Sequence, residues 1–191
     1  MKQIKIASAI ALTLGLAIAG SASAQSSAGG TITFTGSVAD ATCTVTGGAG
    51  TNGGTGNFTV ALPQVAPSDL ATVGETAAPT AFNVQIGGAG QASCVDGSIG
   101  TMSFLTSSPQ IDAASGNLKN ALAGETNAEI QLLDGTTSAP INLATGTYSV
   151  ASPAVANNTA EIPFTAQYVA ADAAATPGTL STSVVYQVVF N

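Results

Sequence analysis

Apolar and polar residues alternate at the C-terminal end of the chain, between Gly178 and Asn191. Four apolar side chains share one side at the two-residue period of a strand, namely Val184, Tyr186, Val188 and Phe190. A long apolar edge strand is an aggregation hazard that soluble monomers blunt with charge, proline or a covering segment, and this stretch has none of them. The pattern predicts a final strand that either lies inside a sandwich or takes a partner.

A second alternating stretch, Gly29–Val38, precedes the first cysteine. Ile32, Phe34, Gly36 and Val38 occupy one side of it, and threonine and serine occupy the other. Two strands that can pair at a sheet edge therefore lie near the two ends of the sequence. They either pair within one molecule, or the first strand of one copy completes the sheet of the next by β-augmentation.

Between these stretches, short alternating runs are separated by Gly, Pro, Asn, Asp and Ser, a spacing typical of an all-β sandwich. The runs are Cys43–Thr46, Phe58–Leu62, Ala81–Ile86, Thr101–Thr106, Glu129–Leu133, Ile141–Leu143 and Glu161–Val169. Asn117–Ala123 predicts one or two helical turns, and Ala170–Ala175 predicts a loop because Pro177 and Gly178 follow it. The glycine-rich run Gly47–Gly56 predicts a further loop, which lacks the lysine of a phosphate-binding loop.

Residues 1–24 have the pattern of a secretory signal peptide. Lys2 and Lys5 precede the apolar run Ile6–Ala19, and Ala22–Ala24 forms a small-residue cleavage site. We expect an exported chain that begins at Gln25 and has 167 residues, enough for one domain with a sizeable core. An uncleaved anchor is the alternative, although the apolar run is short for a bilayer span.

Removal of the signal takes two of the three lysines, so that the net charge changes from −7 to −9 and Lys119 remains as the single basic side chain. Such a chain has no basic patch to bind phosphates, and anionic lipid surfaces repel it. We therefore expect no nucleic-acid partner and no stable membrane insertion.

Few residues offer reactive chemistry. Cys43 and Cys94 in an exported chain predict a disulfide, and closing a loop of about 50 residues stabilises the fold by about 4 kcal/mol. Two thiols without histidine lack the clustered ligands of a zinc site, so we expect no metal and no cofactor. Glu125 and Glu129 are the nearest approach to a catalytic acid pair, but glutamates four residues apart are typical of a solvated face. We predict that the protein is not an enzyme.

The mature chain resembles, over essentially its whole length, the chaperone–usher fimbrial subunits of Gram-negative bacteria, and most closely the type 1 fimbrial major pilins. The likeness rests on Gly30–Val38 before Cys43, Phe82–Ile86 before Cys94, Ile130–Asp134, and Ile162–Tyr168 with the closing strand. The family has a glycine fourteen residues from the C-terminus and an aromatic residue next to last, which Gly178 and Phe190 match. It usually has tyrosine at the penultimate position and an arginine in the segment that matches Ala166–Tyr168, where this chain has Phe190 and Gln167.

The resemblance implies an incomplete immunoglobulin-like β-sandwich over residues 41–191, which lacks its seventh strand, and a donor-strand extension over residues 25–40. It also implies a periplasmic chaperone that first lends a strand to the acceptor residues of the C-terminal segment: Gly178, Val184, Tyr186, Val188 and Phe190. The donor residues Ile32, Phe34, Gly36 and Val38 of another copy then replace that strand at an outer-membrane usher.

The implied product is a cell-surface fimbria that supports adhesion and contains copies of this pilin together with minor pilins. The alternatives are a minor adaptor and an adhesive, carbohydrate-binding subunit. A tip adhesin carries a second, receptor-binding domain, for which we expect the length to leave no room.

Overall fold

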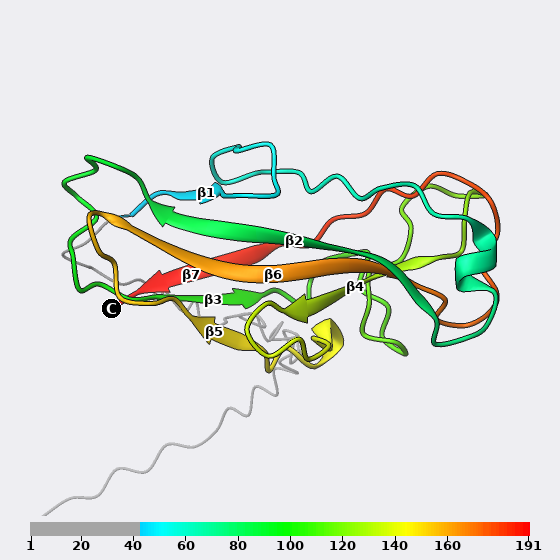
Figure 1. The fold of residues 1–191 in the computed structure, drawn as a ribbon. Helices are drawn as coiled ribbons and strands as arrows, with labels where there is room; N and C mark the ends of the chain where they lie inside the picture. The colour runs from blue at the N-terminus through cyan, green and yellow to red at the C-terminus, as the bar shows by residue number, and fades with distance from the viewer. Residues whose placement is uncertain (1–42) are drawn as a thin grey trace, which may run out of the picture. The chain divides into compact units, whose positions relative to one another are not determined.

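Residues 43–191 are described in the computed structural model, which consists of two β-sheets (Figure 1). The first sheet has the order β1-β2-β6-β4 and the second has the order β5-β3-β7, and all neighbouring strands are antiparallel. The strands are β1 (Val45–Gly47), β2 (Thr76–Gly87), β3 (Gly100–Phe104), β4 (Glu129–Asp134), β5 (Ser149–Ala151), β6 (Thr159–Val169) and β7 (Tyr186–Phe190). Two short 3-10 helices, η1 (Pro67–Leu70) and η2 (Leu143–Thr145), lie in the connections. The predicted all-β sandwich is confirmed.

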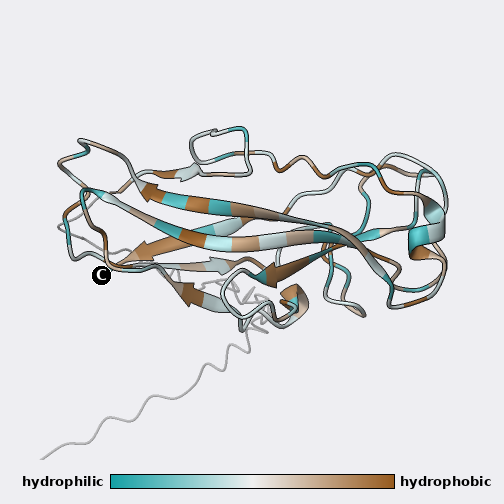
Figure 2. Ribbon diagram, viewed as in Figure 1, coloured by the Kyte–Doolittle hydropathy of each residue, from teal (hydrophilic) through white to brown (hydrophobic). Residues whose placement is uncertain are grey.

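The long strands β2 and β6 form the centre of the first sheet. They pair from Thr76 opposite Val169 to Gly87 opposite Thr159, with one irregularity between Ala77 and Thr80. Apolar and polar residues alternate along both strands, as the colour bands on β2 in Figure 2 show. Because alternate side chains face the second sheet, this pattern buries one face of each strand.

An aromatic cluster joins the two sheets. The Phe164 ring on β6 lies 5.5 Å from that of Phe82 on β2 and 5.6 Å from that of Phe104 on β3. Tyr148 packs against the same group, 6.0 Å from Phe104. Phe164 is 1% exposed, so its ring is the centre of the core.

Pro163 lies inside β6, a position that proline seldom takes in a central strand. It is tolerated because β4 has already ended where Pro163 would need a partner for an N–H, and Gly135 follows β4 there. The Gly135 N–H donates to the Pro163 carbonyl at 3.1 Å, and a Cβ at Gly135 would collide with the Pro163 carbonyl group. The proline and the glycine together mark the end of the β4–β6 ladder.

Two local predictions are wrong. Asn117–Ala123 contains no helix, because Leu118 is extended and bridges Ile111 and Ile130, where it is 3% exposed. Ile141–Leu143 is not a strand, because Asn142 caps η2 by accepting from the Ala144 N–H at 3.0 Å. In both places a tertiary contact or a side-chain cap decides a conformation that the apolar spacing leaves open.

The predicted loops at Gly47–Gly56 and Ala170–Ala175 are confirmed apart from a short pairing of β1 with Thr55. Sequence patterns did not reveal β5, which is only three residues long. The signal peptide and the strand at Ile32–Val38 lie outside the described residues. Within residues 43–191, no helix is long and apolar enough to cross a membrane.

Candidate functional site

The second sheet ends at the C-terminal strand. β7 pairs with β3 from Phe104 opposite Tyr186 to Gly100 opposite Phe190, and it has no strand on its other side among the described residues. The four predicted acceptor residues Val184, Tyr186, Val188 and Phe190 all face the core, as their period requires. They are only half-buried, whereas Val84 and Ile86 on β2 are 0% exposed.

A second row of half-buried apolar side chains belongs to the segment Phe58–Leu62. Phe58, Val60 and Leu62 pack against the core while Thr59 and Ala61 are exposed, so the predicted alternation is present. No strand ladder forms here within residues 43–191, and the segment's only backbone bonds involve Thr59 and Asn52. The alternation seen in the sequence therefore marks a strand-like segment without a sheet neighbour in the described part of the chain.

Phe58 and Tyr186 connect the two rows. Their ring centroids lie 5.8 Å apart, and the Tyr186 hydroxyl donates to the Gly56 carbonyl. Burial raises the pKa of Tyr186, so the phenol stays a neutral donor at physiological pH. Two half-buried apolar rows, each with backbone groups that have no partner among the described residues, form a site that an added strand can occupy. We call the rows Phe58–Leu62 and Val184–Phe190 the acceptor rows.

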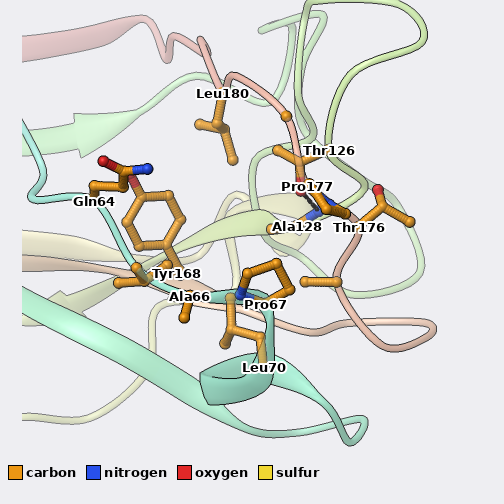
Figure 3. Close-up of a pocket in the computed structure, with 13 residues that line it drawn as sticks. Gln64, Ala66, Pro67, Leu70, Thr126, Ala128, Tyr168, Thr176, Pro177 and Leu180 are labelled. Atoms are coloured by element: carbon orange, nitrogen blue, oxygen red, sulfur yellow. Dashed lines mark hydrogen bonds between the residues drawn. The ribbon is translucent and has the colours of Figure 1, made fainter.

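A cavity of about 160 Å³ lies beside the segment that precedes β7 (Figure 3). One wall contains Ala66, Pro67 and Leu70, and the other contains Pro177, Gly178 and Leu180. Leu180 points toward the Tyr168 ring across this space (Figure 3). Apolar side chains and polar atoms share the lining about equally, and none of the lining side chains is charged.

The geometry is that of a β-sandwich in which β7 has a strand on only one side among the described residues. The family model described as fimbrial protein matches residues 32–191. The chain belongs to the fimbrial protein family. Members of this family are non-enzymatic structural subunits of chaperone–usher pili, so this fimbrial subunit is a component of a cell-surface pilus.

Two relatives show how close this fimbrial subunit is to others. It is 35% identical to the major fimbrial subunit SMF-1 of Stenotrophomonas maltophilia, over 85% of this chain and 92% of that protein. It is 34% identical to the type-1 fimbrial protein, A chain, of Escherichia coli, over 83% of this chain and 82% of that protein.

A solved structure supports the fold. The P pilus rod subunit PapA superimposes with a TM-score of 0.52 at 16% identity, over 71% of this chain and 94% of that one. A likeness at this identity shows the sandwich architecture and nothing more specific.

Gly178, one of the predicted acceptor residues, is exposed and lies close to a neighbouring loop. Its φ is 156°, and a Cβ there would collide with the backbone nitrogen of Thr126 and approach the Glu125 carboxylate. Glycine allows residues 176–182 to run close against the loop that contains Glu125 and Thr126. The close approach gives a physical reason for a glycine at this position, which the family resemblance singled out, and its acceptor role remains a prediction.

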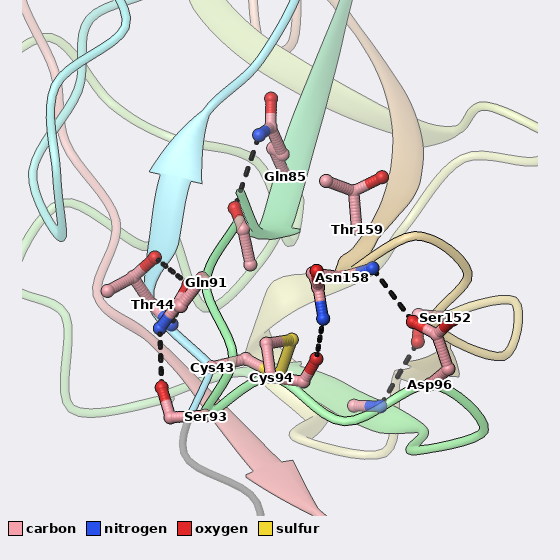
Figure 4. The surroundings of a disulfide bond; sticks show 12 residues. Cys43, Thr44, Gln85, Gln91, Ser93, Cys94, Asp96, Ser152, Asn158 and Thr159 are labelled. Atoms are coloured by element: carbon pink, nitrogen blue, oxygen red, sulfur yellow. Dashed lines mark hydrogen bonds between the residues drawn. A yellow bond between two sulfur atoms is a disulfide. The ribbon is translucent and has the colours of Figure 1, made fainter. Parts of the chain in front are cut away.

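The predicted disulfide is present between Cys43 and Cys94, whose Cα atoms are 4.5 Å apart (Figure 4). Cys43 lies just before β1 and Cys94 lies in the connection from β2 to β3. Asn158 donates to the Cys94 carbonyl at 2.9 Å and thereby fixes the turn before β6 against this connection. The crosslink stabilises the end of the sandwich where β1, β2 and β6 meet.

Gln167 stands where the family has an arginine, and it faces outward on β6. Its amide donates to Gln131 on β4 at 2.9 Å, across the register that pairs these two residues. A neutral amide pair thus replaces any ion pair at this position of the sheet.

The two glutamates considered as an acid pair have separate structural roles. Glu129 is 4% exposed and accepts from Ser115 at 2.6 Å and Asn117 at 3.2 Å, so its assignment to a solvated face is wrong. Glu125 accepts from the Thr179 N–H at 2.7 Å. In the part of the chain that the structure describes, no three His, Cys, Asp or Glu side chains are grouped to hold a metal ion.

The donor residues Ile32, Phe34, Gly36 and Val38 lie outside the described residues, so their role remains a prediction. Sequence reasoning missed the row at Phe58–Leu62 as half of the site. Its alternation was visible, but only the fold brings it close to the C-terminal strand. It also missed the loop around Asn120, because the pattern at Asn117–Ala123 predicted helical turns there.

Proposed function

We propose that this fimbrial subunit is the repeating shaft subunit of its pilus and polymerises by donor-strand exchange. Ile32–Val38 of one copy lies along the acceptor rows of the next copy and supplies the strand that each sandwich lacks. The observation that carries the proposal is the C-terminal strand, which pairs on one side and leaves its core-facing side chains half-buried.

Burial of apolar surface provides the driving force. Covering a half-exposed Val, Tyr or Phe side chain contributes on the order of 1 kcal/mol, and the donor residues Ile32, Phe34 and Val38 add their own apolar area. Each backbone group that gains a partner also avoids the cost of about 1–3 kcal/mol of an unsatisfied buried group. An exchanged strand therefore converts a subunit of low stability into one of high stability.

Gly36 suits the place where the Phe58 and Tyr186 rings meet between the acceptor rows. Phe58 and Tyr186 contact each other between the acceptor rows and fill the space there with aromatic rings. A strand laid over this pair needs a position without a side chain, and Gly36 is the only such position on the apolar side of Ile32–Val38.

The same site accounts for the order of assembly. A periplasmic chaperone covers the acceptor rows first, because an exposed apolar edge would otherwise aggregate. An outer-membrane usher then brings subunits together. Each contact joins two different surfaces, so the contacts do not close into a ring and the product is a filament. The name of the Stenotrophomonas maltophilia relative, a major fimbrial subunit, favours the shaft over a minor adaptor.

The test uses three variants of the arm. Deletion of residues 25–38 and the substitution Gly36→Leu should each leave a normal chaperone complex but yield few or no fibres by electron microscopy. Ser37→Leu adds the same bulk on the opposite side of the strand, and it should yield fibres in normal number. Normal fibres from the deletion variant would overturn donor-strand exchange, and normal fibres from Gly36→Leu would overturn only the glycine argument.

Antibody labelling then separates the shaft from the minor roles. Label along the whole fibre supports the shaft assignment. Label confined to tips or bases would replace it with a minor adaptor or adhesive subunit.

A further inference from the structure

The C-terminal segment alternates between exposed and half-buried residues over a longer range than β7. The alternation runs without interruption from Thr179 to Phe190, although the ladder with β3 covers only Tyr186–Phe190. Residues 179–183 therefore have the conformation of a strand without a strand beside them. Something other than β3 must keep them extended.

The loop Lys119–Asn127, which we call the clasp, takes the place of that strand. The Asn120 side-chain amide donates to the Thr179 carbonyl at 2.8 Å and accepts from the Ser181 N–H at 3.0 Å. The Ala121 N–H donates to the Ser181 carbonyl at 2.8 Å, and Glu125 accepts from the Thr179 N–H. All four backbone groups of Thr179 and Ser181 thus bond to the clasp, as they would bond to a neighbouring strand.

The bonds to the clasp occupy one edge of residues 179–182 and leave the other edge without a backbone partner among the described residues. In a strand, successive residues direct their N–H and C=O groups to opposite sides. Thr179 and Ser181 direct theirs to the clasp, so Leu180 and Thr182 direct theirs to the side of the acceptor rows. No backbone or side-chain partner for these groups of Leu180 and Thr182 is present among residues 43–191.

Leu180 also connects this edge to the cavity. Its half-buried side chain lines the cavity opposite Leu70, and Thr126 of the clasp lines it too (Figure 3). A strand that extends past Val184 along the open edge therefore reaches this cavity at its end.

We propose that Asn120 is a positioning residue that lengthens the acceptor edge from Val184 back to Leu180. This inference rests on the proposed donor-strand exchange. The partner is Val38–Thr42 of a second copy of this chain, the end of the donor segment and the two residues that follow it. Every neighbouring strand pair in the described sandwich is antiparallel, so an arm that lies with Ile32 opposite Phe190 places Val38 opposite Val184 and Thr42 opposite Leu180.

The test measures how fast synthetic donor peptides displace the chaperone from purified chaperone–subunit complexes. A long peptide spans residues 25–42, and a short peptide spans residues 25–37. Asn120→Ala removes the bonds to Thr179 and Ser181, together with the bonds of the same side chain to Thr126 and Leu122 within the clasp. It should slow exchange with the long peptide about tenfold, the equivalent of about 1.4 kcal/mol. Exchange with the short peptide, which does not reach Leu180, should change less than twofold.

Asn127→Ala is the matched control. Asn127 belongs to the same clasp, but it bonds to Thr176 and Ala174, before the alternating segment begins. It should exchange both peptides at the wild-type rate. An equal slowing of both peptides by Asn120→Ala, or an equal effect of Asn127→Ala, would overturn the positioning role.

A measurement on the wild-type subunit covers the case in which Asn120→Ala gives no complex. Amide hydrogen exchange is followed with each peptide bound. The Leu180 and Thr182 amides should be protected with the long peptide and exchange rapidly with the short one. Equal protection with both peptides would overturn the proposal. If neither peptide displaces the chaperone from the wild-type subunit, the proposed function itself fails, a result distinct from failure of the clasp.

Discussion

The centre of the first sheet and the edge of the second carry the same residue pattern in different surroundings. β2 and β6 each pair with strands on both sides, and their inward residues Val84, Ile86 and Ile162 are at most 1% exposed. β7 has the same alternation but one neighbour in the described part of the chain, and its inward residues stay half-buried. The difference lies in the number of neighbours and not in the residues, so an apolar alternating strand can serve as a finished core or as a binding site.

A large effect on stability is expected in the finished core. Phe164→Ala removes the ring that contacts Phe82, Phe104 and Tyr148, and such deletions cost about 3–5 kcal/mol. Denaturant unfolding should show this loss equally with and without a bound donor peptide, because Phe164 lies on the opposite sheet from the acceptor edge. A loss of unfolding free energy that appears only with the peptide bound would show that the core around Phe164 depends on the acceptor edge, which would contradict the comparison.

Loss of the disulfide is expected to have a slightly smaller effect, again independent of the donor strand. The double variant Cys43→Ser with Cys94→Ser opens a loop with a sequence separation of 51 residues and should cost about 2–4 kcal/mol. Thiol titration of denatured wild-type protein without reductant should find no free thiol. Two free thiols would show that the bond does not form in the cell.

At the edge of the second sheet, charged substitutions on the inward and outward faces of β7 should have different effects on chaperone binding. Phe190→Asp places a charge among the inward residues and should weaken chaperone binding by about 2 kcal/mol, roughly thirtyfold. The periplasmic level of this variant should fall through degradation. Val189→Asp is the control, since Val189 is 48% exposed on the outer face, and it should co-purify with the chaperone at the normal level. Equal behaviour of the two variants would contradict the assignment of the inward face.

The smallest effect concerns a hydrogen bond at the rim of the core. Thr137 and then Tyr148 donate to Asp134 and hold its pKa below the ordinary value of 3.8, while burial and this bond raise the pKa of Tyr148. A carboxyl whose pKa is lower in the folded state stabilises the fold above about pH 4, and this stabilisation is lost as the pH falls through the folded-state pKa. Tyr148→Phe should cost about 1 kcal/mol at neutral pH.

The pH dependence provides the check on this bond. The difference in unfolding free energy between wild type and Tyr148→Phe should shrink as the pH falls below 3.8, because a protonated Asp134 accepts more weakly. A difference that stays constant from neutral to acid pH would assign the loss to packing alone.

Sequence patterns predict the long strands well, because β2, β4 and β6 alternate clearly and end at turn residues. They fail where tertiary contacts decide, as at Leu118, which is held extended between Ile111 and Ile130. The inward orientation of Val184, Tyr186, Val188 and Phe190 was predictable from their period of two, and their acceptor role remains a prediction. The position of Phe58–Leu62 opposite them could not be predicted, because an alternating pattern indicates a strand but does not indicate which segments lie beside it. The clasp was not predictable either, since Asn120 acts through its side-chain amide on residues about 60 positions away.

The most direct test of the central claim is a cryo-electron microscopy reconstruction of the assembled fibre at a resolution that traces the backbone. The account predicts a strand between Phe58–Leu62 and Val184–Phe190 that belongs to Ile32–Val38 of the adjacent subunit, with Gly36 over the Phe58–Tyr186 pair. A strand traced to the same subunit, or an acceptor edge covered by any other segment, would contradict donor-strand exchange as the basis of the fibre.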